Sequence, residues 1–273
     1  MEEHTYSFGC IPDKKDVRDY KIDKRKAQAM VYPDAFECEK KARVKNQGNV
    51  GSCTAHASST ILEHHYVGKE KRLSTNFLYG IHYKLFGSEG PGLRIREALN
   101  IMRKYGDPEI GYCPGNTEVA AVYTIAEDAF KDQDSMENAK FYRIDSYAKL
   151  VTNDDIKFAL MNYGPVIGCI KWFGDSYLDE QGILMIGEQL SAYHAIVIYG
   201  WNELGWLCQN SWGATWGKKG YFILPYEYGI EEAYSVIPMG VDSSAINKPV
   251  NNFLLNIIYK LLNLILNAIE AKM

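Results

Sequence analysis

The stretch from Gln47 to Ser58 constrains the fold more than any other part of the chain. It reads QGNVGSCTAHAS, a glycine-broken loop that leads into a helix of small residues, with Cys53 at the joint. Unpaired N–H groups and a partial positive charge at a helix N-terminus favour thiolate, the reactive form of cysteine. The pattern predicts a nucleophilic cysteine. The alternative from this stretch alone is an inert buried cysteine that begins an ordinary helix.

Two residues in the second half of the chain could complete a nucleophilic site. His194 begins an apolar, β-branched run that is typical of a buried strand, and Asn210 follows sixteen positions later. A hairpin turning near residues 202–205 would bring the amide to the imidazole. A thiol nucleophile needs a base, and the base needs a partner that fixes its tautomer. Gln47, six residues before Cys53, could donate to the oxyanion together with the Cys53 backbone N–H.

Four separated blocks of sequence resemble the papain family of cysteine peptidases, with cathepsin B as the nearest branch. The blocks are VKNQG at 44–48, GSC at 51–53, HA at 194–195 and NSWG at 210–213, followed by WG at 216–217 and GY at 220–221. Their order and spacing extend over residues 32–239 and are far more specific than one short motif.

The resemblance implies an α+β, papain-like fold of two lobes, a helical lobe that carries the cysteine and a β-barrel-like lobe that carries the histidine. It implies Cys53 as nucleophile, His194 as general acid and base, Asn210 as its orienting partner and Gln47 as oxyanion donor, in a protease that hydrolyses peptide bonds through an acyl-enzyme. Trp212 would shield the contact between His194 and Asn210 from water. The substrate-binding residues implied by the resemblance are Gly51, Ser52, Gly90, Gly92, Trp212 and Glu232.

The chain departs from the family pattern at two positions. Val50 stands where the family usually has a disulfide-bonded cysteine, and Thr54 stands where it usually has an aromatic residue. The missing bridge favours a reducing compartment.

Cathepsin B trims dipeptides by means of a histidine-bearing loop, whereas residues 87–118 here contain no histidine, which favours an endopeptidase. Glu232 aligns with an acid in the pocket for the second residue before the cut, and a carboxylate there would favour arginine. The alternative is a solvated glutamate.

Composition agrees with a globular enzyme and excludes few activities. The chain has 273 residues, 47% of them hydrophobic, and a net charge of −4, so no basic face for nucleic acid is expected. No cofactor is implied, and no metal site is expected, because the adjacent Glu63, His64 and His65 lack the helical spacing of ligands.

The six cysteines include Cys53, and the five that remain, an odd number, are interpreted mostly as free thiols. No secretory signal and no glycosylation acceptor is visible, which predicts an intracellular, reducing compartment or a virion; frequent Tyr, Asn, Lys and Ile suit a large DNA virus or a bacterium.

Three segments are expected along the chain: a leader at 1–31, a papain-like domain at 32–242, and a linker with an amphipathic helix at 243–273. Within the domain, the helical lobe is expected at about 40–135 and the sheet lobe at about 136–240. By resemblance the leader takes the place of an inhibitory prosegment, and we expect it to lie across the cleft and to be cut near Lys24, Arg25 and Lys26. The alternative is a solvated charged strap without an inhibitory role.

The C-terminal segment from Phe253 to Ile269, residues 253–269, is strongly apolar with one polar stripe. As a helix it would be about 25 Å long, short of the ~30 Å hydrocarbon core of a bilayer. It is therefore expected to lie on a membrane surface or to mediate self-association, the alternative being that it folds back on its own domain.

The pattern predicts helices at 53–66, 75–85, 95–105 and 153–161, and strands at 141–147, 165–172, 194–199, 206–209, 220–224 and 234–237. Two rival functions remain besides proteolysis. Acyl transfer to an amine, as in transglutaminase-like enzymes, fits the order of Cys53, His194 and Asn210 less well. A catalytically silent papain-like binding protein is the other alternative, and the intact set of four catalytic residues argues against it.

Overall fold

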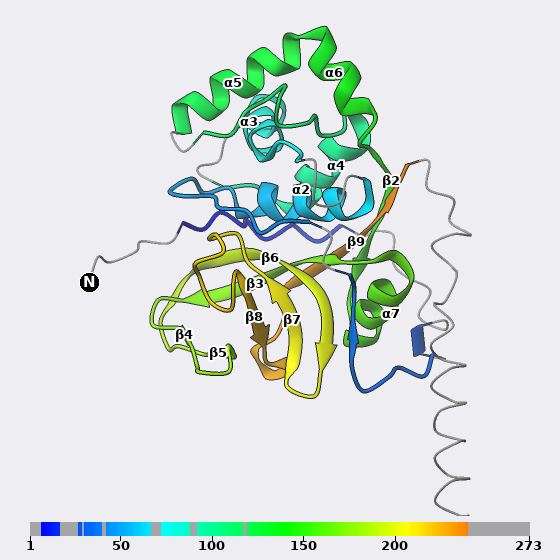
Figure 1. The fold of residues 1–273 in the computed structure, drawn as a ribbon, viewed down its shortest axis with the longest axis vertical. Helices are drawn as coiled ribbons and strands as arrows, with labels where there is room; N and C mark the ends of the chain where they lie inside the picture. The colour runs from blue at the N-terminus through cyan, green and yellow to red at the C-terminus, as the bar shows by residue number, and fades with distance from the viewer. Residues whose placement is uncertain are drawn as a thin grey trace, which may run out of the picture. The chain divides into compact units, whose positions relative to one another are not determined.

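The computed structural model describes residues 7–16, 27–28, 30–39, 42–66, 72–87, 92–116 and 119–239. These residues form a helical lobe and a lobe built on a sheet, with the N-terminal segment 7–16 running between them (Figure 1). We call residues 7–16 the leader strand. The expectation of a two-lobed α+β fold is confirmed.

Five helices of the described part of the chain build the helical lobe. They are α2 (Cys53–Tyr66), α3 (Thr75–Phe86), α4 (Ile95–Lys104), α5 (Val119–Lys131) and α6 (Gln133–Lys140). Ser74 begins α3, since its Oγ accepts the Phe77 N–H at 3.0 Å and satisfies one of the free N–H groups of the first turn. Gly80 lets α5 approach α3, because a Cβ there would lie 2.3 Å from the Ala126 Cβ.

The second lobe is an antiparallel sheet whose strands follow the order β2-β9-β3-β6-β7-β8, with β1 paired to β6. Its strands are β1 (Phe36–Glu37), β2 (Ile144–Leu150), β3 (Val166–Phe173), β6 (Leu190–Asn202), β7 (Gly205–Gln209), β8 (Tyr221–Leu224) and β9 (Glu232–Pro238). Helix α7 (Asn153–Tyr163) packs on this sheet, and β4 (Tyr177–Leu178) pairs with β5 (Leu184–Met185). The register of β3 with β6 sets Cys169 opposite Ala195, and Asn210 directly follows β7.

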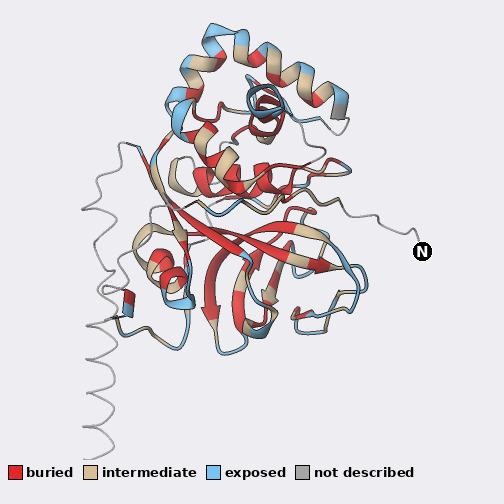
Figure 2. Cartoon of the chain, turned by 180° about the vertical axis from the view of Figure 1, so that it is seen from behind, coloured by how far each residue is buried: buried red, intermediate tan, exposed pale blue. Residues whose placement is uncertain are grey.

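Helix α2 lies in an apolar core that the helical lobe shares with strands β3, β6 and β9, and a second apolar core lies within the sheet lobe. All residues of α2 from Cys53 to Glu63 are buried, which Figure 2 shows as an almost continuous red helix. Small side chains such as Ala55 and Ala57 allow this, because they let α3 and α4 pack on one side and β6 on the other. The predicted nucleophile is thereby fixed at the boundary of the two lobes.

A buried ion pair ties the loop before Cys53 to α2. Lys45 Nζ lies 2.8 Å from Glu63 Oε1 and donates to Ser59 Oγ at 2.7 Å, and both charged side chains are less than a tenth exposed. Glu63 also accepts the backbone N–H of Leu73 at 2.8 Å. The fully buried Asp107 lies near this pair, and burial raises the pKa of its carboxyl well above the usual value, against the opposing effect of Lys45.

Replacing Lys45 with methionine is expected to destabilise the protein by about 3–5 kcal/mol, because it leaves the Glu63 carboxylate buried without a counter-charge. Urea denaturation monitored by fluorescence measures the loss. Lys84→Met is the matched control, since Lys84 lies 2.8 Å from Glu127 but both side chains are more than 40% exposed. That change should cost less than about 1 kcal/mol. Equal losses in the two variants would contradict the argument.

Most predicted elements are confirmed to within a few residues. The helix at 53–66 has the predicted bounds, and the hairpin at 202–205 is present, with Asn202 opposite Gly205. The prediction starts one strand at His194, whereas β6 begins at Leu190, because Leu190, Ala192 and Tyr193 also pair with β3. The prediction also starts a strand at 141, but β2 begins at Ile144, directly after the end of α6 and a turn.

Several predictions lie outside the described residues: the role of Gly90, the cut near Lys24, Arg25 and Lys26, and the helix at 253–269. Within the described part of the chain, no helix combines the length and the apolar character needed to cross a membrane.

Candidate active site

Cys53 and His194 meet where the first turn of α2 faces β6. The Cys53 Sγ accepts the backbone N–H of Ala195 at 3.3 Å, although the two residues are 142 positions apart in sequence. Because Ala195 follows His194 directly, the sulfur lies beside the backbone of the histidine. The loop-to-helix joint and the buried strand therefore come together as the sequence predicts.

Asn210 holds the imidazole of His194 through one nitrogen. His194 Nε2 lies 2.7 Å from Asn210 Oδ1, and the Ser211 N–H donates to the same oxygen at 2.7 Å, which fixes the orientation of the amide. Because Oδ1 can only accept, Nε2 carries the proton. Among the described residues Nδ1 has no hydrogen-bond partner, and it is the nitrogen left to receive a proton. The Trp212 ring stacks on the imidazole at 4.6 Å and shields this contact.

Gln47 is held in place by Ser211, which belongs to the NSWG motif at 210–213 and for which the sequence pattern alone indicates no role. The Ser211 hydroxyl donates to Gln47 Oε1 at 2.6 Å, and the Gln47 backbone N–H donates to the Ser211 carbonyl at 2.9 Å. Gln47 Nε2 donates to the carbonyls of Val50 at 2.9 Å and Ser7 at 3.0 Å. One hydrogen bond of the predicted oxyanion donor thus goes to the leader strand.

The leader strand covers the site. The Phe8 ring meets His194 edge-on at 5.6 Å and Trp212 at 5.7 Å, and Trp212 Nε1 donates to the Ser7 carbonyl at 3.1 Å. As a result, Cys53 and His194 are both 0% exposed. No periodic pattern in the sequence marks Phe8, since the leader strand is extended and only ten residues long.

Two glycines let the leader strand approach the loop before Cys53. A Cβ on Gly9 would lie 1.8 Å from the Gly51 carbonyl oxygen, and a Cβ on Gly51 would lie 2.8 Å from the Phe8 carbonyl oxygen. Backbone atoms on both sides of the contact leave no flexible group that could yield. The leader strand can therefore occupy this position only with glycine at residue 9.

Burial sets the protonation state of the site in this arrangement. It raises the pKa of the Cys53 thiol far above its usual range and lowers the pKa of His194 to about 4, against the opposing effect of the Asn210 hydrogen bond. The loop-to-helix pattern of the sequence predicts a thiolate at this helix N-terminus. In the covered site that prediction is wrong, because desolvation outweighs the helix terminus, and both groups are neutral near pH 7.

The predicted substrate-binding residues gather around the leader strand, with one correction. Ser52 and Trp212 are buried beside the site, and a Cβ on Gly92 would lie 3.0 Å from the Gly9 carbonyl oxygen. The backbone hydrogen bonds of this segment come from Leu93, however, which donates to Gly9 O at 2.9 Å and accepts from Ile11 N at 3.3 Å. Cys10 pairs with Leu93 in a parallel bridge. In this geometry the carbonyl of the residue before Cys10 and the N–H of the residue after it both bond to the backbone of Leu93.

Glu232 is buried rather than solvated. One carboxylate oxygen lies 3.2 Å from Lys149 Nζ, and the other accepts the backbone N–H of Asp13 at 3.0 Å. Only 7% of the residue is exposed. The alternative of a solvated glutamate is therefore wrong for this state of the protein.

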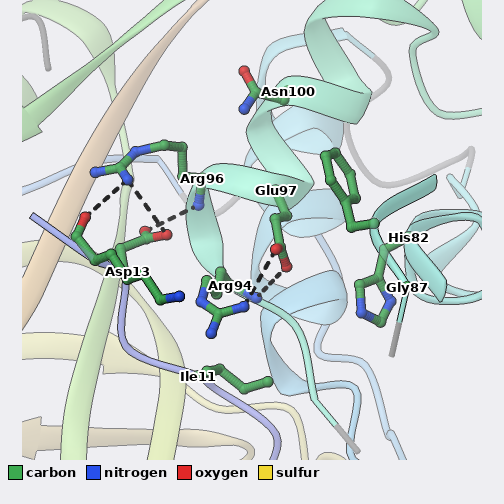
Figure 3. A pocket seen from close by; sticks show the side chains of 10 residues that line it. Ile11, Asp13, His82, Gly87, Arg94, Arg96, Glu97 and Asn100 are labelled. Atoms are coloured by element: carbon green, nitrogen blue, oxygen red, sulfur yellow. Dashed lines mark hydrogen bonds and ion pairs between the residues drawn. The ribbon is translucent and has the colours of Figure 1, made fainter. Parts of the chain in front are cut away.

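Asp13 anchors the far end of the leader strand at the start of α4. Its carboxylate accepts the Arg96 N–H at 3.1 Å and the Tyr234 hydroxyl at 3.0 Å, beside a pocket of about 350 Å³ (Figure 3). Burial and the nearby Glu232 raise the pKa of the Asp13 carboxyl to about 6, against the opposing effect of the Arg96 guanidinium. The bound leader strand therefore holds this proton more tightly than an exposed aspartate does.

Binding of the leader strand is expected to be strongest below pH 4 and to weaken as the pH rises through about 6, because the bound pKa exceeds the usual 3.8. The rate at which an epoxysuccinyl probe labels Cys53, divided by the rate for a Gly9→Ala chain, should rise roughly tenfold between pH 4 and pH 6.5. Asp13→Asn should flatten this ratio. A ratio that falls with pH in the unaltered chain would contradict the prediction.

The cysteines carry no disulfide in this structure, and all six are buried as free thiols. Among the described residues, no group of three or more His, Cys, Asp or Glu side chains could hold a metal ion.

Comparisons with known proteins agree with this geometry. The model of the family described as papain family cysteine protease matches residues 32–237. The chain belongs to the papain family of cysteine proteases. Proteins of this family act on proteins or peptides, and the protease described here is therefore a hydrolase of that kind.

Relatives of this protease include viral proteins. It is 29% identical to an uncharacterized peptidase C1-like protein of Acanthamoeba polyphaga mimivirus, over 85% of this chain and 86% of that one. It is also 29% identical to the viral cathepsin of Adoxophyes honmai nucleopolyhedrovirus, over 67% of this chain and about half (53%) of that relative.

Solved structures share the fold of this protease. Xylellain, a cysteine protease from Xylella fastidiosa, superposes with a TM-score of 0.71 at 22% identity, over 85% of this chain and 96% of that one. Procathepsin B S9 from Trypanosoma congolense superposes with a TM-score of 0.66 at 17% identity, over 85% of this chain and 86% of that one. The papain-like fold predicted from the sequence is confirmed, whereas the cathepsin B branch stays a prediction.

Proposed function

We propose that this protease is an endopeptidase that cleaves peptide bonds through a Cys53, His194 and Asn210 site. The observation that carries the proposal is the position of the Cys53 sulfur, at a helix N-terminus and 3.3 Å from the backbone nitrogen that follows His194. Asn210 fixes the histidine tautomer that leaves Nδ1 free for the thiol proton. This is the arrangement that a nucleophile, a base and an orienting group require.

In the proposed mechanism His194 Nδ1 takes the proton of the Cys53 thiol, and the thiolate attacks the substrate carbonyl carbon. The carbonyl oxygen becomes negative and receives hydrogen bonds from the Gln47 amide and the Cys53 backbone N–H. When the tetrahedral intermediate collapses, the C–N bond breaks and the leaving amine takes the proton from His194. Water then attacks the thioester with His194 as base, which releases the acid and restores the thiol.

The described state is proposed to be the inactive form of the protease. The leader strand excludes water from Cys53 and His194, and burial then opposes transfer of the thiol proton to His194, because this transfer creates two charges in a site without solvent. The leader strand also occupies a donor of Gln47. Departure of the leader strand would restore solvent and free that donor, so activation consists of uncovering a site that is already assembled.

Glu232 is proposed to favour arginine at the second residue before the cut. Once the leader strand leaves, the carboxylate oxygen that accepts the Asp13 N–H becomes available to a guanidinium. Glu232→Gln is expected to lower the preference for arginine over leucine about tenfold, because it removes the charge from one such contact. Glu231→Gln is the control, since Glu231 is 39% exposed and pairs with Lys171. The ratio of kcat/KM for two fluorogenic peptides, one with arginine and one with leucine at this position, measures the preference in each variant. An unchanged ratio in Glu232→Gln would refute this specificity.

Labelling of Cys53 tests the proposed function. The reduced Gly9→Ala chain, in which the leader strand cannot bind, is incubated with an epoxysuccinyl thiol probe, and its intact mass is measured by mass spectrometry. One adduct mapped to Cys53, absent from a Gly9→Ala, Cys53→Ala chain, together with hydrolysis of a peptide substrate, is the expected result. Absence of both labelling and hydrolysis would favour the alternative of a catalytically silent binding protein.

A further inference from the structure

Two thiols that are far apart in sequence meet where the leader strand packs on the sheet. The Sγ atoms of Cys10 in the leader strand and Cys169 in β3 lie 2.7 Å apart, across 159 positions of sequence. The two residues are 6% and 0% exposed. A disulfide bond is about 2.0 Å long, so only a small approach separates these sulfurs from bonding distance. The proposed catalytic chemistry uses neither thiol.

The backbone on each side of Cys10 is fixed by hydrogen bonds. Leu93 donates to the Gly9 carbonyl at 2.9 Å and accepts from the Ile11 N–H at 3.3 Å, and the Cys10 N–H donates to the Tyr193 carbonyl at 3.4 Å. These bonds determine the direction of the Cys10 side chain. Its sulfur can reach the partner thiol without a rearrangement of the leader strand.

Cys169 is held just as firmly from the sheet side. It lies in the middle of β3, opposite Ala195 of β6 and opposite Glu232 of β9. Paired residues of neighbouring strands project from the same face of a sheet, and both Cys169 and Ala195 pack in the apolar core that contains Cys53 and Ala55 of α2. Cys169 therefore belongs to the face of the sheet lobe that meets the helical lobe.

Thr54 stands directly after Cys53, at a position where the resemblance leads one to expect an aromatic residue. Its hydroxyl lowers the pKa of the Cys10 thiol, against a large increase caused by burial and by Cys169. Thr54 is itself fully buried, and a bulky aromatic ring at residue 54 would need more room in this packed region.

We propose that Cys10 and Cys169 form a thiol–disulfide site that fastens the leader strand over Cys53 when a low-molecular-weight disulfide such as glutathione disulfide is present. The regulatory part of this proposal rests on the proposed function. Reduction of the bond releases the fastening. The buried thiols react when the leader strand lifts from the sheet and exposes Cys10 to the oxidant.

The exchange proceeds in two balanced steps. The Cys10 thiolate attacks glutathione disulfide, the glutathione S–S bond breaks, and one glutathione leaves as a thiolate that takes up a proton. The leader strand then returns to the cleft, where the deprotonated Cys169 attacks the Cys10 sulfur and expels the second glutathione. Overall the two protein thiols lose two protons and two electrons, and one glutathione disulfide becomes two glutathione thiols.

This bond would change the consequence of cleavage after the leader strand. A cut near Lys24, Arg25 and Lys26 would separate residues 7–16 from the protease domain along the chain. The bond from Cys10 to Cys169 would nevertheless keep the leader strand attached to β3, where its high local concentration favours rebinding. Release would then require both a cut and a reductant.

Thiol mapping tests the bond without any need for activity. The full chain carrying Cys53→Ala, which keeps five of the six cysteines, is equilibrated with glutathione at increasing ratios of disulfide to thiol, then denatured in acid and alkylated. The expected result is loss of two alkylated thiols together, with a Cys10–Cys169 peptide in a non-reducing digest. Cys10→Ala should abolish this loss and Cys38→Ala, at a buried thiol in the core of the sheet lobe, should preserve it. Five free thiols at every ratio, or a bond from Cys10 to another cysteine, would overturn the proposal.

Labelling of Cys53 by the epoxysuccinyl probe tests the regulation. Oxidation of the otherwise unaltered chain should slow labelling at least tenfold, dithiothreitol should restore it, and Cys10→Ala should remove the redox dependence. Intact mass separates the internal bond from a glutathione adduct on Cys53. Unchanged labelling despite a mapped Cys10–Cys169 bond would overturn the fastening role. Failure of the reduced Gly9→Ala chain to label would instead count against the proposed function, while thiol mapping would still report the bond.

Discussion

Gly9→Ala is expected to accelerate labelling of Cys53 in the full chain about 100-fold, because the added Cβ would cost the bound leader strand about 3 kcal/mol or more. The new atom would lie 1.8 Å from the Gly51 carbonyl oxygen, a contact with backbone that side-chain rotation cannot relieve. The leader strand must then leave the cleft, and water returns to Cys53 and His194. The second-order rate constant for the epoxysuccinyl probe measures the effect under reducing conditions.

A neighbouring change provides the control for Gly9→Ala. Lys15 belongs to the same leader strand but is exposed, so Lys15→Ala should leave the labelling rate within about twofold of the unaltered chain. Equal rates for Gly9→Ala and the unaltered chain would mean either that the leader strand does not limit access or that it adjusts around the methyl group. Hydrogen exchange at Leu93, whose N–H donates to Gly9, distinguishes these outcomes.

His194→Ala is expected to lower kcat/KM for peptide hydrolysis about 10⁴-fold or more, because it removes the base for Cys53 and the acid for the leaving amine in one step. The measurement is made in the Gly9→Ala chain, so that the leader strand does not mask the loss. Asn210→Ala should cost less, about 10- to 100-fold, because the imidazole remains and loses only the partner that fixes its tautomer.

His82→Ala provides the control for the loss at His194. His82 is a buried histidine of α3 that hydrogen-bonds the Tyr79 carbonyl at 2.8 Å and lines the pocket beside Asp13. Its replacement should change kcat/KM by less than about tenfold when circular dichroism shows a folded protein. A His194→Ala chain that keeps a tenth of the activity would exclude His194 as the proton carrier.

Local patterns in the sequence predict most of the regular elements. The small residues after Cys53 form a helix with the predicted bounds, and the turn at 202–205 makes the predicted hairpin. The positions of Cys53, His194 and Asn210 followed from the same reasoning, since a helix terminus and a pair of neighbouring strands place a few side chains within narrow limits. The contacts among these residues can therefore be predicted largely from local patterns, while their catalytic roles stay predictions.

The contacts of the leader strand could not be predicted in this way. The proximity of Cys10 to Cys169 and of Phe8 to His194 arises from an extended segment that crosses both lobes, and such a segment shows no helical or alternating period. The change in the Cys53 pKa depends on those contacts as well. A helix terminus can be inferred from sequence, but the loss of solvent above it cannot.

Cys10 is buried in the apolar core that the helical lobe shares with strands β3, β6 and β9, and this has a consequence for the stability of the enzyme. Part of the hydrophobic core is supplied by the segment whose departure is proposed to activate the protease. Each molecule that becomes active therefore exposes apolar surface and gives up stability, at roughly 25 cal/mol for each Å² uncovered. We expect the active enzyme to unfold and lose activity faster than its precursor. The departure of the leader strand would then both start proteolysis and shorten its duration.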